Sequence, residues 1–200
     1  MSDLVKIAKT EISNSNKLCV IAGLNVLEDD QLTFEVAERL KKITEAQGNS
    51  FIFKASFDKA NRSSVDSYRG PGLKKGLEIF RELKKSDYQL ITDIHEISQV
   101  EQISEVVDII QIPAFLCRQT DLIKEACQSR KPLNIKKGQF LSPDQMKNII
   151  EKCSNFGNDQ IMLCERGTSF GYDNLVVDML GMSKLKTFNC PIIFDVTHSL

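Results

Sequence analysis

Side chains with useful chemistry follow a regular series of short apolar runs along this sequence. The runs are rich in Val and Ile, and each ends in an amide, a cation, a carboxylate or an imidazole. In chain order the endings are Asn25, Lys54, Asp93 with His95, Gln111, Lys136 with Lys137, Arg166, and Asp195 with His198. Cations of this kind bind phosphate and carboxylate, whereas Asp93 and His198 are suited to moving protons or orienting water. For His95, a structural histidine satisfied by a neighbour is the competing interpretation.

The segment 54–72, KASFDKANRSSVDSYRGPG, adds a second group of phosphate-binding side chains. Its members after the strand are Lys59, Asn61, Arg62, Ser63, Ser64 and Arg69. Arginine binds phosphate oxygens through a planar fork, lysine adds a point charge, and serine hydroxyls complete the shell. We expect an anion-binding loop here, with a solvated charged loop as the alternative.

Composition argues against several classes of protein. A net charge of -1 and a pI near 6.2 do not suit a protein that holds nucleic acid or an acidic membrane by bulk charge. Six scattered cysteines without a C-x-x-C pair indicate reduced cytosolic thiols and no sequence-local metal site. Without a membrane-length apolar run or an N-terminal h-region, the chain is expected to be soluble and cytoplasmic.

The apolar runs and the stretches between them predict alternating strands and helices. A chain of 200 residues suits a single domain, here residues 1–200. Parallel strands, buried on both faces, are expected over 18–26, 50–56, 89–94, 106–112, 133–136, 160–165 and 191–196. Helices are expected over 31–46, 73–85, 98–104, 119–129, 143–153 and 174–180, with Ser142 as an N-cap before Pro143.

This alternation fits either an open doubly wound sheet or a closed barrel, and the strand endings favour the barrel. In a (β/α)8 barrel the chemistry collects at the carboxyl ends of several strands, which would bring Lys54, Lys136 and Arg166 to one mouth. An open sheet uses one crevice, and no G-x-G-x-x-G follows the first strand.

From strand alternation we expect Lys136 to point inward and Lys137 outward. The fold class is therefore α/β, a (β/α)8 barrel lacking its last strand and helices in this chain, and the isolated chain is expected to be unstable or inactive.

Several longer motifs carry a resemblance to a known family along nearly the whole chain. They are KASFDKANRSS, SYRGPG, ITDIHE, IIQIPAFLCRQTDL, NIKKGQF, CERG followed by FGYDNLVVDM, and IIFDVTH. With these motifs the sequence resembles the 3-deoxy-D-manno-octulosonate 8-phosphate synthase family. A related family, which makes the heptulosonate of aromatic biosynthesis, typically has a KPRTS-like segment in place of KANRSS.

The resemblance implies an enzyme that condenses phosphoenolpyruvate with arabinose 5-phosphate and water for lipopolysaccharide synthesis, as a homotetramer. From composition we expect it in the cytoplasm, without nucleic-acid or membrane partners. It implies that phosphoenolpyruvate is held by Lys54, Lys59, Gln111, Lys136 and Arg166. Arabinose 5-phosphate would be held by Asn61, Arg62 and Ser63, with Arg118 supplied by a neighbouring subunit. The catalytic group would comprise Asn25, Lys59, Asp93 and His198.

The family has a metal-using branch, which places a Cys at the end of its first strand, joined by a His and two late acidic residues. Asn25 stands at that position, and an amide is a poor ligand for a borderline divalent metal. We therefore expect the metal-independent branch, with no cofactor. Two departures limit the resemblance: Asp29 stands where Ser is more usual, and the C-terminal part is lacking. An inactive fragment, a non-catalytic phosphosugar-binding subunit and a related phosphoenolpyruvate-dependent aldose-phosphate synthase are the alternatives.

Overall fold

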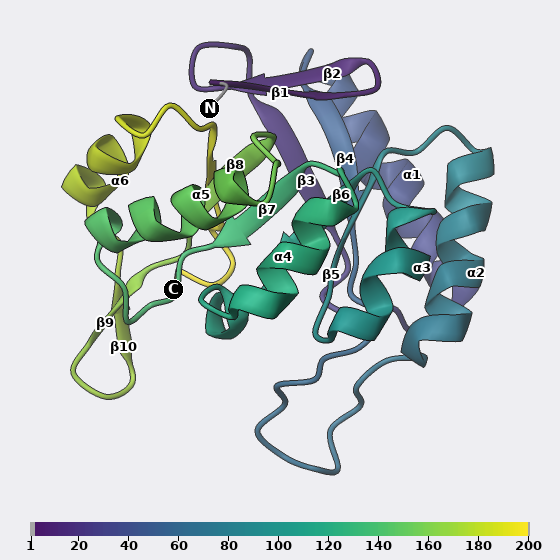
Figure 1. The fold of residues 1–200 in the computed structure, drawn as a ribbon. Coiled ribbons are helices and arrows are strands. Elements are labelled where there is room, and N and C mark those ends of the chain that lie inside the picture. The colour runs from purple at the N-terminus through teal and green to yellow at the C-terminus, as the bar shows by residue number, and fades with distance from the viewer. Residues whose placement is uncertain (1–2, 200) are drawn as a thin grey trace. The chain divides into compact units, whose positions relative to one another are not determined.

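The computed structural model describes residues 3–199, and strands and helices alternate along most of this range (Figure 1). The chain divides into two compact units. The central unit is Lys17–Ile110, and the terminal unit combines residues up to Asn16 with those from Gln111 onward. No helix within residues 3–199 is both long and apolar enough to cross a membrane. Each unit positions its own set of strand-end side chains.

The central unit is built on three parallel strands, β3 (Cys19–Gly23), β4 (Ser50–Lys54) and β5 (Leu90–Asp93). The register places Gly23 opposite Lys54, and Lys54 opposite Ile91. The helices are α1 (Asp30–Ala46), α2 (Gly72–Lys85), the short η1 (Ile97–Gln99) and α3 (Val100–Ser104). Because the strands run in the same direction, Lys54 and Asp93 end neighbouring strands at the same edge.

Apolar side chains at helical spacing attach α2 to this unit. Leu77, Phe80 and Leu83 are buried on one face of α2, as an amphipathic helix requires. At the start of α1, the Asp29 carboxylate accepts a hydrogen bond from the Leu32 N–H at 2.8 Å and so caps the helix. Asp29, which departs from the family pattern, therefore has a structural role here.

The terminal unit contains three further parallel strands, β7 (Leu133–Lys136), β8 (Ile161–Glu165) and β11 (Ile192–Phe194). Its helices are η2 (Ala114–Leu116), α4 (Thr120–Gln128), η3 (Pro143–Gln145), α5 (Met146–Asn155) and α6 (Met179–Lys186). Two antiparallel hairpins pair β1 (Leu4–Ile7) with β2 (Thr10–Ser13) and β9 (Thr168–Phe170) with β10 (Asn174–Val176). Figure 1 shows the β9–β10 hairpin extending beyond the strands of this unit. As expected, Ser142 caps the start of η3, with Pro143 in the first turn.

The seven expected strands all form, as β3, β4, β5, β6 (Ile109–Ile112), β7, β8 and β11. The α/β class is confirmed, and the strands with their intervening helices follow the order of a (β/α)8 barrel through its seventh strand. The expectation that every strand is buried on both faces is wrong for β3 and β11. These are the outer strands of their units, and Gly23 and Phe194 are exposed.

The expected helix over 174–180 is also wrong. Residues Asn174–Val176 form β10, and the helix begins only at Met179. The β-branched Val176 and Val177 suit extended backbone, and the Asp178 carboxylate then accepts a hydrogen bond from the Leu180 N–H at 3.0 Å. An N-cap at Asp178 therefore sets the start of α6.

Candidate active site

A buried cluster joins the carboxyl ends of β4 and β5 in the central unit. The Lys54 Nζ lies 3.7 Å from Oδ1 of Asp93. Between them the Ser56 hydroxyl accepts a hydrogen bond from Lys54 at 3.0 Å and donates to the Asp93 carboxylate. Ser56 is fully buried and Asp93 nearly so. The cluster therefore holds a lysine and a carboxylate in fixed orientations at the end of the paired strands.

His95 completes this cluster. Its Nε2 lies 3.1 Å from Oδ2 of Asp93, and its ring meets Phe57 edge-on with centroids 5.6 Å apart. An ionised carboxylate only accepts, so Nε2 carries the proton in this contact. Burial alone would raise the pKa of Asp93, but Lys54, His95 and Lys59 outweigh it and hold that pKa well below its usual range. Asp93 is thus an anion at neutral pH, and His95 is satisfied by a neighbour on one ring nitrogen.

The expected sugar-phosphate residues lie in the exposed loop between β4 and α2, which projects from the central unit in Figure 1. Asn61, Arg62 and Ser63 are all exposed, and the Arg62 Nε donates to the Tyr68 carbonyl at 3.2 Å. Lys59 is half-buried at the start of the loop. Asn25 is exposed in the bend after β3. These side chains are reachable by a solute.

Arg69 belongs to the structure of that loop. Its guanidinium donates two hydrogen bonds to Asp58, at 2.9 and 2.6 Å. The next residue, Gly70, has a φ of +120°, and a Cβ there would lie 2.4 Å from the Phe57 carbonyl oxygen. The loop therefore needs a glycine at this position for backbone reasons, which supports the turn interpretation of the glycine motif.

In the terminal unit a second cluster forms where β7 and β11 end. The Lys136 Nζ donates to Oδ2 of Asp195 and lies 3.4 Å from Nδ1 of His198. The same Nδ1 is 2.9 Å from Oδ2 of Asp195. Burial opposes ionisation of Asp195, yet His198 and Lys136 hold its pKa well below the usual range. Lys136 and His198, both expected in the site, are brought together by this carboxylate.

Lys137 corrects the sequence prediction, because its side chain is fully buried and does not point outward. Its Nζ lies 3.5 Å from Oε1 of Glu165, which is 2% exposed. Lys137 stands one residue beyond β7, where the alternation of strand side chains no longer applies. Burial of its charge is compatible with folding because Glu165 supplies the opposite charge.

Arg166 and Gln111 occupy partly closed positions in the same unit. Arg166 is half-buried directly after β8, and its Nε is a buried donor without a partner within residues 3–199. The Gln111 side chain is buried, and its Oε1 accepts from the Asn134 Nδ2 at 3.1 Å. Because this contact uses the side-chain oxygen of Gln111, the amide N–H groups of the same side chain are not involved in it and can serve as donors. Arg118, by contrast, is exposed.

Two contributors were missed by sequence reasoning. Ser56 bonds Asp93 from 37 residues away, and Glu165 bonds Lys137 across neighbouring strands. Their positions directly after or at the end of a strand were the signal available.

All six cysteines carry free thiols, and burial raises the pKa of Cys164 to about 12. Within residues 3–199 no three His, Cys, Asp or Glu side chains gather as a metal site.

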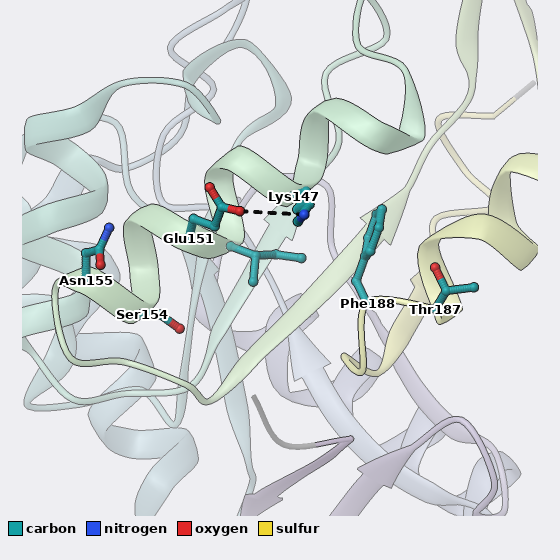
Figure 2. A pocket seen from close by; sticks show the side chains of 7 residues that line it. Lys147, Glu151, Ser154, Asn155, Thr187 and Phe188 are labelled. Carbon is teal, nitrogen blue, oxygen red and sulfur yellow. Dashed lines mark ion pairs between the residues drawn. The ribbon is translucent and has the colours of Figure 1, made fainter.

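A surface pocket elsewhere in the terminal unit contains none of the expected site residues. Figure 2 shows Lys147, Glu151 and Asn155 on α5 beside Thr187 and Phe188 after α6. Lys147 and Glu151 lie 3.9 Å apart and are both largely exposed. An exposed ion pair of this kind contributes little energy, and the strand-end cluster of each unit remains the candidate for function.

Comparisons with known proteins give one matching family and a set of similar sequences. The sequence pattern of the DAHP synthetase I family matches residues 4–200. A 2-dehydro-3-deoxyphosphooctonate aldolase of Hahella chejuensis is 55% identical over 197 residues, covering 98% of this chain and 70% of the relative. Proteins of the same name from Pasteurella multocida and Pseudomonas syringae are 54% and 52% identical, with the same coverage.

Proposed function

This chain belongs to the DAHP synthetase I family, and we propose that it is a 3-deoxy-8-phosphooctulonate synthase. The reaction joins phosphoenolpyruvate, D-arabinose 5-phosphate and water into 3-deoxy-D-manno-octulosonate 8-phosphate and inorganic phosphate. The names of the relatives support it, since each describes an aldolase of a deoxyphosphooctonate. The KANRSS segment supports the same choice over a heptulosonate-forming enzyme.

The observation that carries the proposal is the set of cations at the carboxyl ends of the strands. Lys54 ends β4, Lys136 ends β7, and Arg166 follows β8. Phosphoenolpyruvate carries a carboxylate and a phosphate, and such cations match both groups. We assign it to Lys54, Lys59, Gln111, Lys136 and Arg166. Gln111 is suited to donate through its amide nitrogen, because the contact with Asn134 uses only its oxygen.

Arabinose 5-phosphate is assigned to the loop after β4. Asn61, Arg62 and Ser63 are exposed and combine a guanidinium, an amide and a hydroxyl, which suits a sugar phosphate. Arg118 is exposed in its own unit and is assigned to the site of a neighbouring subunit in a homotetramer. We place this assembly in the cytoplasm, without nucleic-acid or membrane partners.

The chemical step forms one carbon–carbon bond and releases one phosphate. C3 of phosphoenolpyruvate attacks the aldehyde carbon, water adds to C2, and phosphate then leaves C2. Asp93 and His198 are assigned to orient the water and handle protons, with Lys59 and Asn25 beside the reacting groups. Fixed cations around the phosphate stabilise the charge that develops as it departs.

We further propose that this enzyme works without a metal ion or other cofactor. The support is the residue at position 25, where an amide stands at the end of the first strand in place of the thiolate of the metal-using branch. Amide oxygen is a weaker ligand than thiolate for borderline divalent metals. Asn25 is then free to contact substrate or water.

The deciding experiment measures phosphate release by the protein. Phosphoenolpyruvate is supplied with either arabinose 5-phosphate or erythrose 4-phosphate, and the product is identified by mass. We expect release only with the five-carbon sugar and an eight-carbon product. A preference for erythrose 4-phosphate would instead assign a heptulosonate synthase. Binding of both substrates without release would assign a phosphosugar-binding subunit.

A further inference from the structure

The buried ion pair between Lys137 and Glu165 has no role in the reaction described above. It lies directly beside two proposed substrate ligands, because Lys137 follows Lys136 and Glu165 precedes Arg166. We propose that Lys137 and Glu165 are positioning residues that fix the Arg166 turn for the phosphate or carboxylate of phosphoenolpyruvate. This inference rests on the proposed function and adds two residues to it.

The turn after β8 is organised around one oxygen atom of Glu165. Oε1 accepts hydrogen bonds from the Arg166 N–H at 2.9 Å and the Gly167 N–H at 2.7 Å. Gly167 has a φ of +90°, a backbone conformation that favours glycine. Two successive N–H groups that point at one carboxylate hold the backbone of Arg166 in a single orientation.

Lys137 connects the residues after β8 to the loop after β7 through hydrogen bonds and an ion pair. Its Nζ donates to the Thr168 hydroxyl at 3.0 Å and to the Leu141 carbonyl at 3.4 Å. These hydrogen bonds use two of the three donors of the ammonium, which also forms the ion pair with Glu165 at 3.5 Å. The Ser169 N–H also donates to the Gln139 carbonyl at 2.9 Å. Two loops that leave neighbouring strands are therefore braced by one buried side chain.

The Arg166 side chain shows why this bracing serves a ligand. Its Nε is buried and has no partner within residues 3–199, and the Oε1 of Gln139 in the braced loop is likewise unpartnered. A buried guanidinium N–H without an acceptor is unfavourable. A phosphate or carboxylate oxygen of a ligand would satisfy that donor. The ion pair thus fixes the backbone of a residue whose side-chain donor has no acceptor within residues 3–199.

The test compares kinetics of Glu165→Gln and Lys137→Met with a matched control. Asp108→Asn is the control, because Asp108 also accepts from a backbone N–H, that of Leu90 at 2.7 Å, and from a lysine, Lys84 at 2.8 Å. The Asp108 carboxylate lies at the amino-terminal start of β5, which is the other end of this strand from its carboxyl end. We expect KM for phosphoenolpyruvate to rise by about tenfold or more, since small misplacements of binding groups are costly. KM for arabinose 5-phosphate should change by less than about twofold, and Asp108→Asn should change neither.

A second measurement does not depend on activity. Amide hydrogen exchange of Arg166 and Gly167 should be faster in Glu165→Gln than in the parent and in Asp108→Asn. If a single variant fails to fold, the double variant Lys137→Met, Glu165→Gln removes both charges together and takes its place. A folded variant with unchanged KM for phosphoenolpyruvate, or with unchanged exchange at both amides, overturns the inference. A parent protein that releases no phosphate refutes the proposed function alone, and the exchange result still decides the bracing role.

Discussion

The Nδ1 atom of His198 lies 2.9 Å from Oδ2 of Asp195, and the His198 N–H donates to Oδ1 of the same carboxylate at 3.1 Å. Asp195 therefore holds both the ring and the backbone of His198. Because an ionised carboxylate can only accept, the proton on Nδ1 faces Asp195 and Nε2 is left for other partners. Asp195 therefore fixes which nitrogen of His198 is available to another group.

From this relationship we predict that Asp195→Asn lowers kcat by about 100-fold or more. The amide removes the charge that pairs with Lys136 and allows the other ring tautomer of His198. Steady-state phosphate release measures the effect, and thermal unfolding shows whether the variant is folded. A folded variant with parental kcat would contradict the orienting role of Asp195.

Much of this site was predictable because parallel strands bring their carboxyl ends to one edge. Lys54 and Asp93 were expected from their positions at the ends of apolar runs, and they do interact. Ser56 was not predicted, because its role appears only when β4 and β5 pair across 37 residues of sequence. Lys137 was misplaced because strand alternation was extended one residue past the end of β7.

The fold shows the same division between local and long-range information. The β1–β2 hairpin was not predicted, although Val5 and Ile7 are buried and Lys6 between them is exposed. That alternation was a local signal for a strand. Helix α6 was shifted because the β-branched run before Asp178 was taken as its first turn. Caps and alternation were thus present in the sequence, whereas contacts between strands were not.

Acid should weaken the fold through Asp93. Its folded pKa is depressed below the unfolded value of about 3.9. The stabilisation is therefore present above that unfolded value and is lost as pH falls toward the folded pKa. We predict that Asp93→Asn lowers the free energy of unfolding by about 3 to 5 kcal/mol at pH 7, because Lys54 and His95 lose a buried partner.

Urea unfolding between pH 7 and pH 3 measures this effect. The difference between Asp93→Asn and the parent should narrow below about pH 4, because the unfolded parent then takes up a proton on this carboxyl while the folded parent does not. The exposed Asp66 provides the control, since Asp66→Asn should leave the profile unchanged. If the difference in the free energy of unfolding between Asp93→Asn and the parent stays constant to pH 3, the charge of Asp93 is not the source of the stabilisation.

Removal of metal ions should leave the rate unchanged. Asn25 offers an amide where the metal-using branch has a thiolate, so no divalent ion is expected to be needed. Phosphate release is measured after extensive dialysis against a chelator, with metal content checked by elemental analysis. Loss of activity that zinc or manganese restores would place the enzyme in the metal-using branch.

Arg62 should govern affinity for the sugar phosphate. Arg62→Ala removes an exposed guanidinium in the loop after β4, so we predict that KM for arabinose 5-phosphate rises by about tenfold or more. KM for phosphoenolpyruvate should remain within about twofold. Lys74→Ala removes an exposed cation from α2 and should alter neither constant. Equal rises of both constants in Arg62→Ala would argue for general loss of loop structure.

Gly70 should be the least replaceable glycine of the loop. With its φ of +120°, an alanine Cβ would lie 2.4 Å from the Phe57 carbonyl oxygen and 2.8 Å from Cγ2 of Val26. Gly72 also has a positive φ, +81°, but a Cβ there meets nothing within 4 Å. Both alanine variants carry the conformational cost of about 1 to 2 kcal/mol, and only Gly70→Ala adds the steric clash.

We therefore predict that Gly70→Ala lowers the free energy of unfolding by about 3 kcal/mol or more, and Gly72→Ala by clearly less. The Phe57 carbonyl accepts the Gly72 N–H at 3.1 Å, so displacing it should also move the loop that carries Arg62. KM for arabinose 5-phosphate should then rise in Gly70→Ala more than in Gly72→Ala. Urea unfolding and steady-state kinetics of the two variants measure both effects, and equal destabilisation by the two alanines would mean that the loop relaxes without strain at Phe57.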